Sequence, residues 1–239
     1  CSRFKNPDKY LLKKANLLDI DFLNDINIKN NLFIKKLHKY NCDLFVSMSF
    51  DQIFNLELLQ IPKLGAINCH ASKLPFYRGR NILNWVLIND EKEFGITVHY
   101  IDEGIDTGDI ILQKTFPISD KDNYKSLLNL SYKECPTILY EAVLLILHNQ
   151  VNRISQNSIS LDGSYCKKRN IGDEFIKGNL TTRQLFNFIR GITFPGPCAR
   201  SYIRSNLIKI INSEIEYKTE FNNVGAGRIA YVNKKFFVI

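Results

Sequence analysis

The fold of this chain is limited most by a regular alternation of short apolar runs with helical patterns. The runs at residues 44–48 and 66–70 have the length and the turn-forming flanks of buried strands. A helical pattern follows Arg80, and strand-like runs return at 95–101 and 110–116. Strands that alternate with helices form open α/β sheets. We therefore predict an α/β fold with an open, mostly parallel sheet.

The second half of the chain has a different pattern. A helical stretch runs from about 124 to 147, and Pro136 inside it predicts a kink or a break into two helices. Beyond residue 149 the pieces become short and turn-rich, with one clear helix at 182–190 that ends at Gly191. Strand-like runs follow at 207–211 and 228–238. We predict a main domain over 1–165 and a small β-rich region with one helix over 166–239.

Composition narrows the class of protein. With 45% apolar residues the chain can bury a core, and its longest apolar run is too short to cross a membrane. The six cysteines show no CxxC spacing and no clustering with histidine, which argues against a disulfide framework and a structural zinc site. We expect a soluble, cytoplasmic protein without a metal. The net charge of +8 favours an anionic partner without identifying it.

Two polar segments carry residues suited to catalysis. Asn68 and His70 lie at the end of the strand predicted at 66–70, and alternation along a strand puts both on one face. In open α/β sheets, ligands bind where strands end. The segment 102–109 places four acids around two glycines, and one of its carboxylates could orient the histidine. Taken separately, a histidine at a strand end and an acidic glycine-rich loop are more often structural.

The two segments together resemble a known family. The runs NCHASKLPFYRG at 68–79 and GITVHYIDEGIDTGDII at 95–111 are similar to the two signatures of the folate-dependent formyltransferases. The resemblance implies a Rossmann-like formyltransferase fold and a catalytic Asn68, His70 and Asp106. It implies that Asn68 and His70 stabilise an oxyanion, while Asp106 orients His70 and helps to take a proton. Family members usually open with a further strand and helix, which we expect this chain to lack.

The resemblance also implies a formyl donor, N10-formyltetrahydrofolate, and no metal. The residues that it places at the donor are Ser49, Phe50, Gln52, Ile53, Asp102, Gly104 and Ile105. Judged from the sequence alone, Phe50 and Ile53 also fit core positions. The formyl donor would lie against the acidic loop, residues 102–109, and would contact the backbone of that loop.

The acceptor is implied by the run RNILNW at 80–85, which resembles the sugar-nucleotide branch of the family. We expect a homodimer that formylates a nucleotide-linked amino sugar, specifically dTDP-4-amino-4,6-dideoxyglucose for O-antigen and lipopolysaccharide synthesis. The candidate substrate-binding residues are Tyr77, Arg78, Arg80, Asn81, Trp85, Tyr165, Lys167, Arg169 and Phe194. For Trp85 the sequence favours a helix residue packed on the sheet over substrate contact, and Tyr165, Lys167, Arg169 and Phe194 equally fit surface loops.

Several alternatives stay open. A 3-amino sugar or a UDP-linked sugar fits the same motifs, as does a methionyl-tRNA formyltransferase-like enzyme. Hydrolysis of the formyl donor needs the same catalytic residues, with water in place of the amine. A basic RNA-binding protein with a degenerate site would show steeply salt-dependent binding and no turnover. The intact Asn68, His70 and Asp106 argue against that last alternative, so we expect no nucleic-acid partner.

Overall fold

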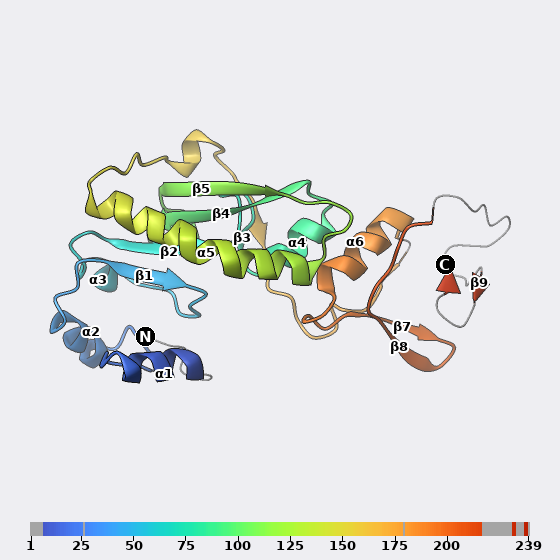
Figure 1. Ribbon diagram of the computed structural model, residues 1–239, viewed down its shortest axis with the longest axis horizontal. Helices are drawn as coiled ribbons and strands as arrows, with labels where there is room; N and C mark the ends of the chain where they lie inside the picture. The colour runs from blue at the N-terminus through green and yellow to red at the C-terminus, as the bar shows by residue number, and fades with distance from the viewer. Residues whose placement is uncertain (1–6, 26, 179, 217–230, 233–236, 239) are drawn as a thin grey trace. The chain divides into compact units, whose positions relative to one another are not determined.

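The computed structural model describes residues 7–25, 27–178, 180–216, 231–232 and 237–238 (Figure 1). The predicted α/β class, with a central sheet and a small antiparallel C-terminal sheet, is confirmed. The elements are, in chain order, α1 (Lys9–Leu17), α2 (Asn31–His38), β1 (Phe45–Met48), α3 (Leu56–Leu59), β2 (Ala66–His70), β3 (Arg78–Gly79), α4 (Ile82–Ile88), β4 (Glu93–Tyr100), β5 (Ile110–Pro117), α5 (Tyr124–Leu147), the 3-10 helix η1 (Gln156–Ser158), β6 (Tyr165–Cys166), α6 (Thr182–Ile192), β7 (Ala199–Ile203), β8 (Asn206–Ile210), β9 (Tyr231–Val232) and β10 (Phe237–Val238).

The chain divides into two compact units, each built from separate segments. The first contains Cys1–Ile82, Phe94–Phe116 and Ser131–Lys167, and the second contains Leu83–Glu93, Pro117–Leu130 and Lys168–Ile239. The division after residue 165 remains a prediction. All three predicted catalytic residues belong to the first unit.

The central sheet sets the register of the catalytic strand. Its strand order is β1-β2-β4-β5, with β2 parallel to β1 and antiparallel to β4. Asn68 stands opposite Ser47 on one side and opposite His99 on the other. Strand β4 is buried on both faces, with Ile96, Val98 and His99 all nearly inaccessible. The sheet therefore places a buried histidine directly beside the predicted catalytic asparagine.

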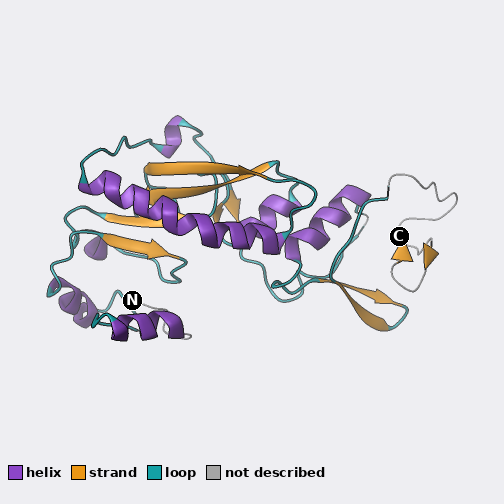
Figure 2. Ribbon diagram, in the orientation of Figure 1, coloured by secondary structure: helices purple, strands orange, loops and turns teal. Residues whose placement is uncertain are grey.

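Helix α5 is continuous, so the predicted break into two helices at Pro136 is wrong. Figure 2 shows a single helix over 124–147, and Pro136 lies inside it without dividing it in two. A proline at this position leaves the carbonyl of Tyr132 without its helical donor. Tyr132 is 68% exposed and Pro136 is exposed as well, so water can bond that carbonyl. The helix also packs on β2, where the Cys69 sulfur lies 3.9 Å from the Cys135 carbonyl oxygen.

The second unit contains α6 and the hairpin β7–β8. Thr181 and Gln184 form a capping box at the start of α6, which stabilises that end. The helix runs past Gly191, so the predicted stop there is wrong. Gly191 instead permits α6 to pack closely on Ile88, because a Cβ atom at position 191 would lie 2.9 Å from the Ile88 side chain. The strand predicted at 207–211 corresponds to β8, whereas the one at 228–238 falls mostly outside the described residues.

No helix of the described residues is long and apolar enough to cross a membrane.

Candidate active site

Asn68, His70 and Asp106 converge in the first unit. Strand β2 presents Asn68 and His70 on the same face, and the loop between β4 and β5 brings Asp106 to them. The His70 Nε2 atom lies 3.7 Å from Asp106 Oδ2, and Asn68 Nδ2 donates to Asp106 Oδ1 over 3.4 Å. The side chains of His70 and Asp106 are only 12% and 13% exposed. The three predicted catalytic residues thus form one largely buried cluster.

His70 has a defined proton position. Its Nε2 lies 3.1 Å from the carbonyl oxygen of Tyr77, and since a carbonyl can only accept, Nε2 carries the hydrogen. The neutral ring then has Nδ1 as its acceptor. Burial lowers the pKa of His70, and this outweighs the opposing effects of Asp106 and of the Tyr77 carbonyl. The ring is therefore neutral at neutral pH and able to take up a proton.

Asp106 is held as a carboxylate. Burial acts to raise its pKa, but the side chains of His99 and His70 and the Gly79 backbone N–H together lower it to about 2. The Gly79 N–H donates to Oδ2 over 2.9 Å. The backbone of Asp106 has φ of +55°, a left-handed conformation that few residues other than glycine adopt. Asp106 is thus ionised at neutral pH and is held in an unusual backbone conformation.

His99 is a site residue that the sequence did not single out. Its Nδ1 lies 2.7 Å from the Tyr100 carbonyl oxygen and therefore donates to it. Its Nε2 faces Asn68 Nδ2 at 3.3 Å and Asp106 Oδ1 at 3.6 Å. The ring is 2% exposed. A histidine inside an otherwise apolar strand was the available signal, but only the antiparallel register of β2 and β4 places it beside Asn68.

The glycines of the acidic loop allow close backbone approach. A Cβ atom on Gly108 would lie 2.0 Å from the Tyr100 carbonyl oxygen, and one on Gly104 would meet the Thr107 hydroxyl at the same distance. The Asp102 carboxylate accepts from the Gly104 N–H and from the Thr107 hydroxyl. Asp102 therefore shapes the loop, while Asp106 is the acid that reaches the histidines.

The residues predicted at the donor fall into two groups. Gln52 is committed to the fold, because its side chain accepts from the Ile28 N–H and donates to the Asp25 carbonyl. Phe50 packs against the core cluster of Ile28, Phe33, Ile34 and Leu58. Exposed positions are held by Ser49 and Gly104 and by the apolar side chains of Ile53 and Ile105, which are 55% and 47% exposed. Ile53 and Ile105 are thus the apolar members of the set that remain accessible.

In the first unit, Arg78 is the buried member of the predicted substrate-binding residues. Arg78 is 6% exposed, and its guanidinium donates to the Gln156 side chain. Tyr77 donates its N–H to the Ser164 hydroxyl, and the Tyr165 hydroxyl donates to the Ile105 carbonyl. The remaining members of this unit, Arg80, Asn81 and Lys167, are exposed.

The other predicted substrate-binding residues lie in the second unit. There the Arg169 guanidinium stands over the Trp85 ring, 5.5 Å from its centroid, and donates to the Asp173 carbonyl. Phe194 is 62% exposed. The structure thus brings Arg169 and Trp85 together within one unit, a contact that the sequence did not predict.

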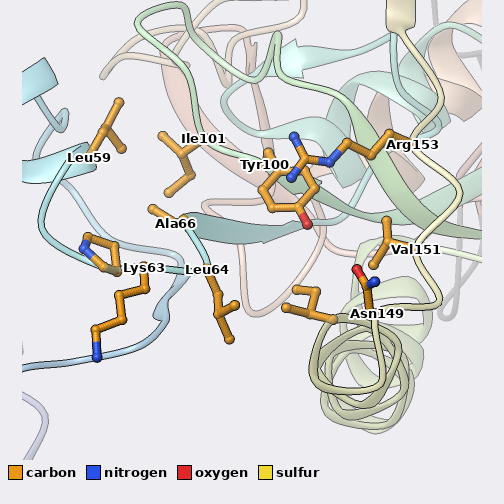
Figure 3. A pocket seen from close by; sticks show the side chains of 12 residues that line it. Leu59, Lys63, Leu64, Ala66, Tyr100, Ile101, Asn149, Val151 and Arg153 are labelled. Carbon is orange, nitrogen blue, oxygen red and sulfur yellow. The ribbon is translucent and has the colours of Figure 1, made fainter.

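A cavity of about 480 Å³ lies elsewhere in the first unit. It opens at the start of β2 and the end of β4, where Figure 3 shows the Arg153 guanidinium over the Tyr100 ring, 4.0 Å from its centroid. Ala66 and Lys63 are among its other lining residues, and Asn68, His70 and Asp106 are not. In the part of the chain that the structure describes, no group of three or more His, Cys, Asp or Glu side chains could hold a metal ion.

Sequence comparisons find similar known proteins. A sequence model of the formyl transferase family matches residues 3–143. A methionyl-tRNA formyltransferase from Thermodesulfovibrio yellowstonii is 37% identical over 188 residues, which are 79% of this chain and 60% of that protein. The chain therefore spans less than two thirds of that relative.

Two solved structures share the fold across most of the chain. A 4-N formyltransferase from Francisella tularensis has a TM-score of 0.71 and 26% identity, covering 91% of this chain and 86% of its own. An N-formyltransferase from Helicobacter canadensis, in complex with folinic acid and dTDP-3-aminofucose, has a TM-score of 0.70 and 28% identity. That match covers 95% of this chain and 77% of the other.

Proposed function

Because the chain belongs to the formyl transferase family, we propose that it transfers a formyl group from N10-formyltetrahydrofolate to a primary amine. The observation that carries this proposal is the convergence of Asn68, His70 and Asp106 in one buried cluster. An amide donor, a neutral imidazole and a carboxylate supply the groups that acyl transfer to an amine requires.

The reaction forms a bond between the amine nitrogen and the formyl carbon while the carbonyl electrons move to oxygen. The Asn68 amide is the donor that we assign to this oxyanion. Its bond to Asp106 is 3.4 Å long and therefore weak, so one N–H can turn to the developing charge. Replacing Asn68 by alanine would cost roughly 3 kcal/mol of barrier, or about a hundredfold in rate.

His70 and Asp106 handle the proton that the amine loses. The sequence resemblance implied that His70 also donates to the oxyanion, but its Nε2–H already faces the Tyr77 carbonyl. We therefore assign the neutral His70 and the ionised Asp106 to accept the amine proton. The same proton then moves to the donor nitrogen as its bond to the formyl carbon breaks, so one proton is transferred in each turnover.

Folate binding is supported by the similar structure from H. canadensis, whose complex contains folinic acid. The exposed apolar side chains of Ile53 and Ile105 and the backbone of Gly104 are the residues that we assign to the pteridine ring. Gln52 is left out of this assignment because both ends of its amide hold the Asp25–Ile28 segment.

A nucleotide-linked amino sugar is the acceptor that we propose. It is supported by the two similar structures, a 4-N formyltransferase and an enzyme bound to dTDP-3-aminofucose. Among the residues predicted for the acceptor, Arg80, Asn81 and Lys167 have exposed polar side chains in the first unit, the unit that also contains Asn68, His70 and Asp106. The specific sugar dTDP-4-amino-4,6-dideoxyglucose, its use in O-antigen synthesis, and a homodimer stay predictions.

Charged initiator methionyl-tRNA is a second candidate acceptor, favoured by the 37% identity to a methionyl-tRNA formyltransferase.

A competition assay decides between the amino-sugar nucleotide and the charged tRNA. The purified protein is given the formyl donor with an equimolar panel of 3-amino and 4-amino sugar nucleotides and charged tRNA, and the products are resolved by mass spectrometry. We expect a formylated sugar nucleotide. Formylation of the tRNA alone would overturn the sugar assignment, and formate release without an acceptor would indicate hydrolysis.

A further inference from the structure

We infer that Gln156 is a positioning residue that holds the Asp106 loop in its catalytic geometry, while Arg78 fixes the orientation of the Gln156 amide. Gln156 begins η1 and lies far from Asp106 in the sequence, yet its side chain is 2% exposed and lies against the acidic loop. All the residues involved belong to the first unit. The kinetic consequence of this inference rests on the proposed function, whereas its structural part does not.

The Gln156 amide connects two points of the loop. Its Nε2 donates to the carbonyl oxygen of Asp106 over 2.9 Å and to that of Gly108 over 2.8 Å. A side-chain amide has two N–H groups, so both are used. The two carbonyls flank Thr107, and Asp106 has a left-handed backbone conformation that is unfavourable for a residue other than glycine. The two hydrogen bonds therefore stabilise a loop conformation that its own backbone disfavours.

Arg78 determines which end of the amide faces the loop. Its Nε and Nη2 atoms both donate to Gln156 Oε1, over 3.1 and 2.8 Å. A guanidinium has only donors, so the oxygen of Gln156 must face Arg78 and the NH₂ group must face the carbonyls. Arg78 also stands beneath the Tyr165 ring, whose hydroxyl donates to the Ile105 carbonyl. Arg78 thus supports the acidic loop both through Gln156 and through Tyr165.

The position of the Asp106 carboxylate depends on this support. Oδ2 stands 2.9 Å from the Gly79 nitrogen and 3.7 Å from His70 Nε2. A displacement of about 1 Å in such a group lowers turnover by about a hundredfold. Loss of the two Gln156 bonds would leave the carbonyls of Asp106 and Gly108 without these donors. The loop would then relax away from Gly79 and from the histidines.

The substitution Gln156→Glu tests the inference. A glutamate keeps the acceptor for Arg78, so the buried guanidinium stays paired and the fold is retained, but it cannot donate to the loop carbonyls. Gln113→Glu is the matched control, because the Gln113 amide likewise donates to a carbonyl, that of Leu74, and to the Thr97 hydroxyl. We expect kcat to fall about a hundredfold in Gln156→Glu, with KM for both substrates within about threefold. Gln113→Glu should keep kcat within about threefold of the parent protein.

Hydrogen exchange supplies a measurement that needs no turnover. The Gly79 N–H donates to Asp106, whereas the neighbouring Arg78 and Arg80 N–H groups donate to the Ser164 and Cys166 carbonyls. We expect Gly79 to exchange about tenfold faster or more in Gln156→Glu, with Arg78 and Arg80 unchanged. Faster Gly79 exchange in this variant alone supports the inference, and unchanged Gly79 exchange overturns it whatever the kinetics show. If the parent protein transfers no formyl group, the proposed function fails while the exchange result still decides this inference.

Discussion

The ionised state of Asp106 makes a quantitative prediction about stability. Its pKa falls from an ordinary value of 3.8 to about 2 in the folded protein, through the histidine side chains and the Gly79 N–H. A carboxyl group whose folded pKa is lowered adds stability above its unfolded pKa and loses it as the pH falls toward the folded pKa. The difference between the two values corresponds to about 2 kcal/mol in total, of which about 1 kcal/mol is lost by pH 3.

The substitution Asp106→Asn isolates this contribution. Urea unfolding of the parent protein and of the variant is measured at intervals from pH 7 down to pH 3. The difference in unfolding free energy between them should be constant from pH 7 to about pH 5 and then shrink by about 1 kcal/mol by pH 3. Other acids with lowered pKa values, such as Asp90 and Asp122, are present in both proteins and cancel. A difference that stays flat across the whole range would refute the assignment of Asp106 as a stabilised carboxylate.

Three further predictions concern the site. His70→Asn should lower formyl transfer at least about a hundredfold without changing the thermal midpoint by more than a few degrees. In the parent protein, kcat should stay flat as the pH falls through 6.5, because burial lowers the pKa of His70. A decline in kcat centred at pH 6.5 or above would contradict this expectation. Gly108→Ala should cost about 1–3 kcal/mol of stability and most of the activity, because the alanine Cβ atom would lie 2.0 Å from the Tyr100 carbonyl oxygen. Glu103→Ala, on the exposed part of the loop, serves as the control. Equal stability in the two loop variants, measured by urea unfolding, would show that the loop tolerates a Cβ atom there.

The sequence predicted the elements that follow from periodicity. Strands β1 and β2 and the start of α4 appear where apolar runs and helical spacing indicated them, since burial on a sheet imposes that pattern. The shared face of Asn68 and His70 follows from strand alternation alone. Asp106 required the family resemblance, because nothing local distinguishes it from the other acids of its loop.

Residues that act through tertiary contacts could not be predicted in this way. His99 reaches Asn68 only because β4 runs antiparallel to β2, and no local pattern in the sequence gives the register of that pair. Gln156 meets the acidic loop from a turn-rich segment without periodicity. Pro136 does not divide α5 because Tyr132 and Pro136 lie on an exposed part of the helix, which the sequence does not show. Each of these outcomes depends on which residues pack together in the folded chain. Such contacts join residues far apart in the sequence and leave no local pattern in it.

We propose that Asn68, His70 and Asp106 transfer a formyl group between folate and an amine. The most direct measurement is a single-turnover reaction of excess protein with an isotopically labelled formyl donor and an amino-sugar nucleotide, followed by mass spectrometry of the nucleotide. We predict that the label moves to the sugar amine at a rate that His70→Asn lowers by about a hundredfold or more. Label that stays on the formyl donor, or transfer that is equally fast in His70→Asn, would contradict the proposed transfer by these three residues.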